Sequence, residues 1–287
     1  MTDTALPPRR FGLPAALRHW SIATGAVILA VVVLAAILAP WIAPHDPFRM
    51  GSGPRLSPPG AAHWFGTDEL GRDLFSRVLV GARASLGIGL AAVVAGLGLG
   101  VSFGLVIAFC PARLKGLLLR IVDVVYSFPD TLLALALVAF LGPGAENATL
   151  AIAISLIPFY ARVTYGLAAV ERAKPYVEAA QIAGTAPTRI MRVQVLPNML
   201  QSLIVIGSIG FSSAILSAAG LSFLGLGVQP PSPEWGSILA SGRNYIARAP
   251  WILIFPGLAI CLTVLSFNLI GDGIRDLTDP KGRRRRG

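Results

Sequence analysis

Apolar residues in this chain gather into long runs that are separated by short charged segments. A membrane-spanning helix needs about 20 mostly apolar residues to cross a hydrocarbon core of roughly 30 Å. Six runs are long enough, namely Trp20–Pro44, Ala84–Ala112, Ile121–Leu141, Ala148–Gly166, Val193–Pro233 and Ala249–Gly271. The fifth run holds a single span, Met199–Phe223, followed by a loop rich in Gly and Pro. The pattern therefore predicts an all-α polytopic membrane protein with six transmembrane helices.

The composition agrees with a membrane protein and offers little chemistry of its own. Of the 287 residues, 54% are hydrophobic and 13% are charged, which is about half the charged share of a soluble domain. The first apolar run exceeds the roughly 7–15 residues of a cleaved signal peptide, so we expect it to remain as the first span, 21–43. Cys110 and Cys261 lie in different spans and are expected to stay unpaired. There is no P-loop and no HExxH motif, so no catalytic residue, metal or cofactor is expected in this chain.

The basic residues indicate how the chain is oriented. Six spans place both termini on one side, and that side carries 17 of the 24 Lys and Arg residues. Because cytoplasmic loops are the ones rich in Lys and Arg, both termini are expected in the cytoplasm. The ends of the chain are then a cytoplasmic N-terminus, 1–20, and a basic cytoplasmic tail, 272–287, which includes Arg283–Arg286. We expect this tail to contact anionic lipid rather than nucleic acid.

The segment between the first two spans, 44–83, is expected on the outer side. It opens with five prolines within 44–59, which favour irregular structure. Thr67 or Asp68 then suits the cap of a helix. The apolar residues that follow recur at helical spacing, at Leu70, Leu74, Phe75, Val78 and Leu79. This pattern predicts an amphipathic helix that either lies on the outer membrane surface or packs on the bundle.

Two of the spans carry features that concern the shape and packing of helices. In the second span, small residues recur at every fourth position, at Ala92, Gly96, Gly100, Gly104 and Ala108. Such a stripe lets another backbone approach closely, so its glycines are expected at a helix–helix contact. In the third span, Pro129 is expected to kink the helix near mid-depth because proline removes a backbone hydrogen bond.

Three charged residues fall inside the expected spans. A charge at the centre of a bilayer costs about 2.5–3.5 kcal/mol on insertion scales, so such groups usually pair or face water. In one interpretation Arg162 pairs with Asp130 or Asp123 and fixes how the third and fourth spans pack. In the other, Arg162 reaches the inner headgroups while Asp130 faces a water-filled pathway. The fifth span carries several hydroxyl groups, among them those of Ser208 and Ser212. These hydroxyls are expected either to form hydrogen bonds between packed helices or to line the pathway.

The connection between the fourth and fifth spans, 167–198, is the most informative segment. It is far longer than a simple link between two helices needs to be. The residues Tyr176–Ala183 predict a short helix, and Gly184 is suited to a left-handed stop after it. Pro187 suits the first turn of a second helix, which is expected to end at Leu196–Asn198.

Two short helices joined at a glycine would form a rigid knob on the cytoplasmic side. The small side chains of Ala179 and Ala180 allow a partner to approach closely, and Glu178 offers a charge for a Lys or Arg. The pattern therefore indicates a surface on which another protein docks.

This loop resembles a known motif. Glu178-Ala179-Ala180, Gly184 and the closing Leu196-Pro197 are similar to the EAA loop of ABC-importer permeases, although Gln194 stands where that family has Ile. In that family the loop is the coupling helix that docks into a cleft of the ATPase subunit. The resemblance implies that these six residues contact such a subunit.

Further blocks narrow the resemblance and extend it over about residues 60–280. They are Phe65–Asp68 with Gly71–Asp73, Gly220–Gly227 with Pro230-Pro231 and Glu234–Gly236, and Asn268–Asp276 with Asp279-Pro280. With the EAA loop they occur in the order found in the dipeptide/oligopeptide/nickel permeases. The chain is identified as a member of that family, as its second, C-type permease subunit.

The resemblance implies an ABC type I importer permease (MetI-like) fold, with a five-helix core over 84–271, in the bacterial inner membrane. It also implies partners: a second homologous permease, two cytoplasmic ABC ATPases that bind ATP and Mg, and an extracytoplasmic solute-binding protein. The chain would form half of a pathway for short peptides, or alternatively for nickel or another small solute. ATPase motion would reach the spans through the EAA loop.

An intramembrane enzyme and a passive channel are the two alternatives to a permease. An intramembrane enzyme needs ionisable groups gathered at one depth, but His19, His45 and His63 all lie outside the spans. Asp123 and Asp130 are seven residues apart on one helix, which gives only loose support for a catalytic dyad. A passive channel has no need of the cytoplasmic knob. The sequence therefore favours a non-catalytic transport subunit.

Overall fold

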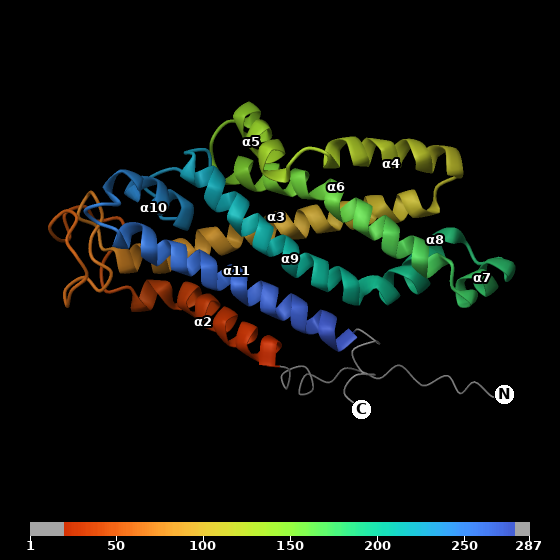
Figure 1. Ribbon diagram of the computed structural model, residues 1–287, viewed down its shortest axis with the longest axis horizontal. Helices are drawn as coiled ribbons and strands as arrows, with labels where there is room; N and C mark the ends of the chain where they lie inside the picture. Colours follow the sequence, from red (N-terminus) through yellow and green to blue (C-terminus); the bar gives the residue numbers. More distant parts are fainter. Residues whose placement is uncertain (1–19, 279–287) are drawn as a thin grey trace.

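The computed structural model describes residues 20–278, which form helices and no β-strand (Figure 1). Five helical stretches are long and apolar enough to cross a membrane, namely α2 (Trp20–Ile42), α3 (Leu74–Phe109), α6 (Ala145–Arg172), the stretch Pro187–Phe223 that contains α9 (Leu196–Phe223), and α11 (Trp251–Thr278). The bent pair α4 (Ala112–Tyr126) and α5 (Asp130–Leu141) passes the same test when it is taken together. Counting that pair as one span gives the six predicted spans. Residues 1–19 and Arg283–Arg286, which carry part of the orientation argument, lie outside the described residues.

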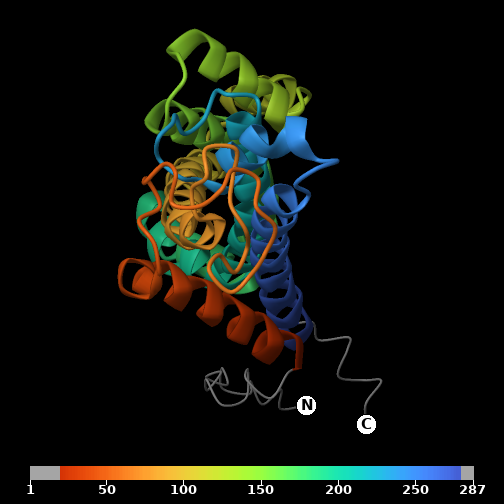
Figure 2. The same cartoon turned by 90° about the vertical axis from the view of Figure 1, so that its left-hand side faces the viewer.

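The shorter helices lie at the two ends of the molecule (Figure 1). One end carries α7 (Pro175–Ile182), α8 (Pro187–Arg189) and a π-helical turn, Ile190–Val195. The opposite end carries α10 (Trp235–Gly242), a 3-10 turn at Arg243–Tyr245, and the irregular segment that joins α2 to α3 (Figure 2). The two groups of short elements are therefore separated by the length of the spans.

The glycine stripe of α3 lies against α6. All three glycines of the stripe are buried. A Cβ atom added to Gly100 would lie 2.5 Å from Cβ of Tyr160, and one added to Gly104 would lie 2.5 Å from the carbonyl oxygen of Ala161. At Gly96 the nearest atom is the carbonyl oxygen of Ala153, at 2.9 Å. No side chain larger than hydrogen fits between the two backbones at these positions, so the stripe sets how closely α3 and α6 pack.

The remaining spans pack around this pair. The hydroxyl of Ser212 on α9 donates to the side-chain oxygen of Asn268 on α11 at 2.9 Å. On α2, a Cβ atom added to Gly25 would lie 2.7 Å from the carbonyl oxygen of Ser266 on α11. Large apolar side chains on α2, such as Val27 and Val31, are exposed. This outward apolar face is suited to contact with lipid.

The predicted amphipathic helix at the outer surface is absent, which corrects the sequence analysis. Helix α3 begins only at Leu74 and runs unbroken to Phe109. Its N-cap is Asp73, whose Oδ2 atom accepts a hydrogen bond from the amide of Ser76 at 2.8 Å. The apolar spacing around Val78 therefore belongs to the first turns of the second span rather than to a separate helix.

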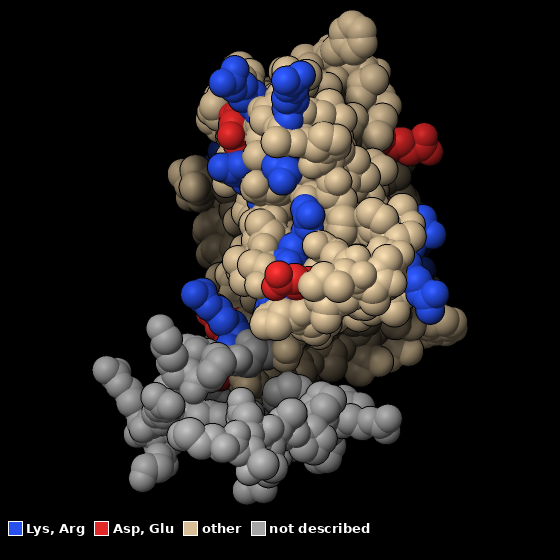
Figure 3. Space-filling view, turned by 90° about the vertical axis from the view of Figure 1, so that its right-hand side faces the viewer, with Lys and Arg blue, Asp and Glu red and all other residues tan. Residues whose placement is uncertain are grey.

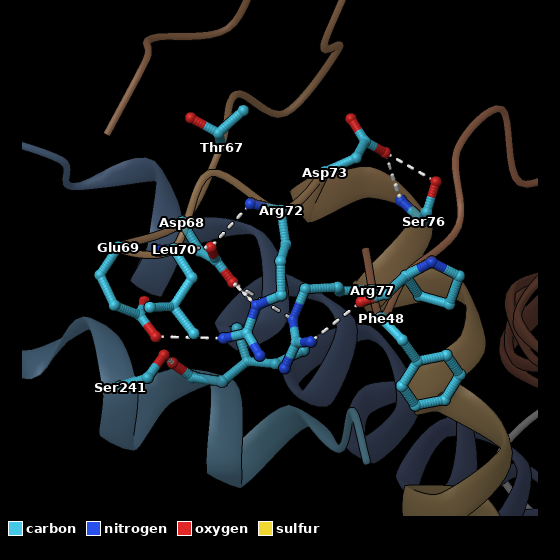
Figure 4. A network of polar contacts seen from close by, with 12 residues as sticks. Phe48, Thr67, Asp68, Glu69, Leu70, Arg72, Asp73, Ser76, Arg77 and Ser241 are labelled. Carbon is cyan, nitrogen blue, oxygen red and sulfur yellow. Dashed lines mark hydrogen bonds and ion pairs between the residues drawn. The ribbon is translucent and has the colours of Figure 1, made fainter. Parts of the chain in front are cut away.

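Two local features explain why no helix starts at Asp68. Its Oδ1 atom accepts hydrogen bonds from the amides of Leu70 and Arg72, both at 2.9 Å, which folds the chain into a tight turn. Gly71 then adopts φ +72°, a left-handed conformation that stops a helix. The side chains of Arg72 and Arg77 turn inward onto Asp68, as Figure 4 shows.

The third span is broken rather than kinked. Helices α4 and α5 meet at an angle of 84°, which is a far larger change than the mid-depth kink expected from Pro129. Proline disfavours helical geometry in the residue before it, here Phe128, so α4 ends before this point. Helix α5 restarts at Asp130, whose carboxylate accepts a hydrogen bond from the amide of Thr131 at 2.8 Å. A negative charge at a helix N-terminus is favourable, so Asp130 stabilises the start of α5 directly after the break.

Candidate functional site

The connection between α6 and α9 forms a knob whose base is fixed and whose outer face is free. At the base, Val177 and Ile190 are buried and pack with Met199 of α9 in one apolar cluster. On the outer face, Glu178 and Ala179 are exposed. The knob therefore stands on the bundle and presents its charged and small side chains outward.

The turn after α7 is the predicted left-handed stop. Gly184 adopts φ +74° and is exposed, with open space around its α-carbon. The amide of Thr185 donates to the carbonyl of Ala180, and that of Gly184 to the carbonyl of Gln181, both at 3.0 Å. These two bonds form a Schellman motif, which satisfies the last carbonyls of the helix. The prediction of a glycine stop at this position is confirmed.

The second helix of the knob does not end at Leu196–Asn198, which corrects the sequence analysis. Pro187 does begin α8, but the chain then passes through the π-helical turn and continues directly into α9. Pro197 is the second residue of α9, directly after the π-helical turn, so the helix continues through a residue that has no backbone N–H to donate. Leu196 is partly buried and Pro197 is exposed. The knob is therefore joined to the fifth span without a flexible break.

A polar contact at the base ties the knob to two spans. Glu171, at the end of α6, accepts a hydrogen bond from the hydroxyl of Tyr176 and pairs with Lys174 at 2.6 Å. The amide group of Asn198 on α9 donates to the Tyr176 hydroxyl at 3.3 Å. Desolvation, and then the bond to Glu171, raises the pKa of Tyr176 to about 12, so the phenol keeps its proton at neutral pH. Figure 3 shows Lys and Arg side chains on the surface of this end of the molecule.

The intramembrane charges are arranged as one ion pair and one separate carboxylate. Arg162 lies 3.4 Å from Asp123, measured from Nε to Oδ1, and both side chains are nearly half exposed. Asp130 instead accepts a hydrogen bond from the hydroxyl of Ser213 at 3.1 Å. Of the two aspartates considered as partners, the structure places Asp123 beside Arg162.

The ion pair leads to a prediction for assembly. Arg162→Asp should lower the amount of folded chain in the membrane, because it sets two carboxylates against each other between α4 and α6. Asp123→Arg combined with Arg162→Asp should recover most of that loss. The effect of the pair should be modest, about 1 kcal/mol or less, since both groups are exposed. Membrane-fraction yields of the single and double variants measure it, and a swap with Asp130 that rescues equally well would refute the pairing with Asp123.

Asp130 borders a cavity of about 480 Å³ beside the break between α4 and α5. Its polar lining also includes Ser213, Ser155 and the backbone of the break, and its apolar lining includes Phe128 and Phe159. The hydroxyl of Tyr160 is buried close by without a hydrogen-bond partner. A carboxylate with hydroxyls in a part-open cavity can hold a cation or an ammonium group.

The predicted pathway serines do not share this cavity. Ser212 bonds to α11, and Ser208 donates to the carbonyl of Val205 in its own helix at 2.7 Å. The sequence analysis did not assign Ser155 or Tyr160 to a site, and nothing in the local sequence marks them. Ser155 shares the cavity with Asp130 only because α5, α6 and α9 meet beside the break.

The sequence matches two family descriptions. Residues 96–284 match the family "Binding-protein-dependent transport system inner membrane component". Residues 17–59 match "N-terminal TM domain of oligopeptide transport permease C". Together they cover the first span and the whole region from the glycine stripe to the tail.

Several peptide permeases are similar to this chain over most of its length. The chain is 49% identical, over 90% of its length and 87% of the relative's, to a di/tripeptide transport system permease protein of Pseudomonas aeruginosa. It is equally identical, over 90% and 87%, to a probable D,D-dipeptide transport system permease protein of Escherichia coli. A glutathione transport system permease protein of Escherichia coli is 44% identical over 90% of this chain and 86% of its own.

The fold resembles that of a solved transporter subunit. A chain of the MetNI methionine ABC transporter in an inward-facing conformation superposes with a TM-score of 0.60 at 20% identity. The match covers 71% of this chain and 97% of that one. A likeness at this identity shows the expected MetI-like fold. By the family match over 96–284, this chain belongs to the binding-protein-dependent transport system inner membrane components, which are non-catalytic, multi-pass membrane subunits of importers.

Proposed function

We propose that this chain forms half of a pathway for the import of short peptides and receives the motion of ATPase subunits through the knob built on α7. The named relatives are permeases for di/tripeptides, D,D-dipeptides and glutathione. These names favour a short peptide over nickel as the substrate. The high identity and coverage support carrying this class of substrate over to the present chain.

The observation that carries the coupling role is the mechanical connection of the knob. Its base contacts α6 through Glu171 and continues into α9 without a break. Helices in lipid keep their backbone hydrogen bonds and so move as units. A force applied to the exposed face at Glu178 and Ala179 would therefore move both spans together, as a rigid body.

The remaining parts of the machine follow from this role. A second homologous permease supplies the other half of the pathway, and two cytoplasmic ATPases bind ATP and Mg and dock on the knobs. A solute-binding protein delivers the peptide on the outer side, and nucleic acid has no part. The proposed location is the bacterial inner membrane with both termini in the cytoplasm. The basic end in Figure 3 supports this orientation, since it carries α7.

Reconstitution tests the proposal. The chain is co-expressed with the second permease and the ATPases and placed in vesicles that contain ATP, with the binding protein and a labelled dipeptide or tripeptide outside. We expect ATP-dependent peptide accumulation that an excess of Ni²⁺ does not compete with. Nickel uptake without peptide uptake would overturn the substrate class, and uptake that needs no ATPase would overturn the coupling.

A carboxylate in the cavity beside the break is expected to act on the peptide's ammonium group during passage. Asp130→Asn keeps the side chain's size and removes its charge. A hydrogen bond to a charged group contributes about 1.5–3 kcal/mol, so peptide uptake should fall by about tenfold or more. ATP hydrolysis should stay unchanged, and assembly should change little, because an asparagine oxygen can still accept the hydrogen bond from the Thr131 amide. Ser208→Ala, outside the cavity, is the matched control, and equal uptake by both variants would show that Asp130 does not contact the substrate.

A further inference from the structure

Two histidines and an aspartate meet at the end of the bundle opposite the knob. His63 Nδ1 lies 2.8 Å from Asp73 Oδ1, and His45 Nδ1 lies 3.7 Å from the same oxygen. All three ligand atoms lie within 4.8 Å of one another. The imidazole rings face each other at a centroid distance of 4.8 Å. Three groups of the kind that bind transition metals therefore converge from three separate parts of the chain.

The Asp73 carboxylate is held in place and lacks a cationic partner. Its side chain is fully buried. Its Oδ2 atom accepts bonds from the amide and the hydroxyl of Ser76, at 2.8 and 2.7 Å (Figure 4). Oδ1 is the atom that lies beside the histidines. The nearby guanidinium groups of Arg72 and Arg77 are paired with Asp68 instead. Within residues 20–278, no ion pair joins Asp73 to a Lys or Arg. Its carboxylate is instead contacted by Ser76 and by the two histidines, of which His63 is hydrogen-bonded to Oδ1 through Nδ1.

Each histidine is positioned by a different neighbour. Gly53 closely approaches the Nε2 side of His63, which turns Nδ1 toward the carboxylate. His45 is held through its backbone amide, which donates to the hydroxyl of Ser76 at 3.2 Å. The Nδ1 atom of His45 is buried and has no hydrogen-bond partner. This unpartnered nitrogen is the second sign, besides the cluster itself, that a ligand belongs between the three groups.

From this geometry we propose that His45, His63 and Asp73 bind one Zn²⁺ ion, with water as the fourth ligand. Zinc binds imidazole nitrogen and carboxylate oxygen at about 2.0–2.2 Å in tetrahedral geometry, which sets two ligand atoms about 3.3 Å apart. The two nitrogen–oxygen separations, 2.8 and 3.7 Å, fall on either side of that value, and all three ligand atoms lie within 4.8 Å of one another, so the side chains shift slightly to take up the ion. The side chain of His45 is 32% exposed, which leaves it room to close the remaining gap and gives the ion a way in.

The bound ion is expected to cross-link the irregular segment between α2 and α3. The ion would join the chain just after α2, the middle of the segment and the N-cap of α3. Nitrogen ligands favour zinc over Mg²⁺ and Ca²⁺, which prefer sites built from oxygen. No metal was expected in this chain, because the sequence holds no HExxH motif.

Metal content measures the site directly. The full-length chain is purified in detergent through a tag that contains no histidine, in a Cys110→Ser/Cys261→Ser background that removes thiolate ligands. After incubation with Zn²⁺ and gel filtration, the parent chain should retain about one zinc ion. His45→Gln and His63→Gln should each lower the retained zinc by about tenfold or more. His19→Gln, which changes the one other histidine, is the matched control and should retain the parent amount.

Two further readouts separate a site from adventitious binding. Co²⁺ should give the intense visible absorption of a tetrahedral complex with the parent chain and with His19→Gln, and should not with His45→Gln. Zn²⁺ should raise the melting temperature of the parent chain, while Mg²⁺ at the same concentration should not. Retained zinc that is equal in parent and His45→Gln, or a parent chain that keeps less than about a tenth of an equivalent, would overturn the proposal. Only variants that elute as the parent does are compared, and His45, being partly exposed, is the variant expected to fold.

Discussion

A chain carrying Gly184→Pro should insert and assemble, yet its importer should take up no peptide above background while the ATPases continue to hydrolyse ATP. Gly184 adopts φ +74°, whereas the proline ring holds φ near −65°. Proline also removes the amide that bonds to the carbonyl of Gln181. The turn after α7 would have to rebuild, which would move the exposed face of the knob away from its docking position.

Two further substitutions should reduce peptide uptake for separate reasons. Gly184→Ala places an ordinary residue in the left-handed region, which costs about 1–2 kcal/mol, and should reduce uptake only in part. Glu178→Lys leaves the turn intact and reverses the charge on the exposed face, so it should uncouple transport through docking alone. Gly166→Ala is the control, because Gly166 lies within α6 with open space around it. Peptide uptake and ATP hydrolysis are measured in parallel, and their ratio gives the coupling between the two. Undiminished uptake by Gly184→Pro and Glu178→Lys at normal expression would refute the role of the knob.

The second large effect is expected at the contact between α3 and α6. Gly100→Leu should lower the yield of intact complex about tenfold or more. Even a Cβ atom at this position would lie 2.5 Å from Cβ of Tyr160 and 3.0 Å from the carbonyl oxygen of Ile157. Overpacking costs about 1–3 kcal/mol where side chains can shift, and more where a backbone must move. Association in lipid depends on this close approach, since lipid supplies no hydrophobic drive between helices.

The chain offers a close control for this substitution. Gly98 lies on the same helix, two residues away, and has nothing within 4 Å of an added Cβ atom. Gly98→Leu changes hydrophobicity and helix propensity by the same amount but adds its bulk where there is space. The amount of complex recovered by size-exclusion chromatography is compared between the two variants. Their ratio measures the effect of the steric clash at Gly100 alone. Equal yields would mean that α3 and α6 can separate at Gly100 without loss of the fold.

Features that depend on short stretches of sequence were predictable. The spans follow from uninterrupted apolar length, because the bilayer imposes the same requirement on every spanning helix. The stop at Gly184 and the helix start at Pro187 follow from backbone preferences of single residues. The small-residue stripe indicated a close helix contact, although the pattern could not name α6 as the partner. The resemblance of 167–198 to the EAA loop could be seen because its residues lie within one continuous segment.

Features that depend on distant neighbours were decided by the tertiary structure. The amphipathic pattern after Asp68 is the same for a surface helix and for the first turns of a span. The structure decides between the two, because the side chains of Arg72 and Arg77 turn inward and pair with Asp68. Pro129 marked a disturbance, but its size depends on how α5 packs beside α6 and α9. The choice of Asp123 over Asp130 for Arg162 rests on that same break. The cluster of His45, His63 and Asp73 matches no metal-binding motif, although all three residues lie within one segment, 45–73. Only the path of that irregular segment, which the tertiary structure decides, brings their side chains together.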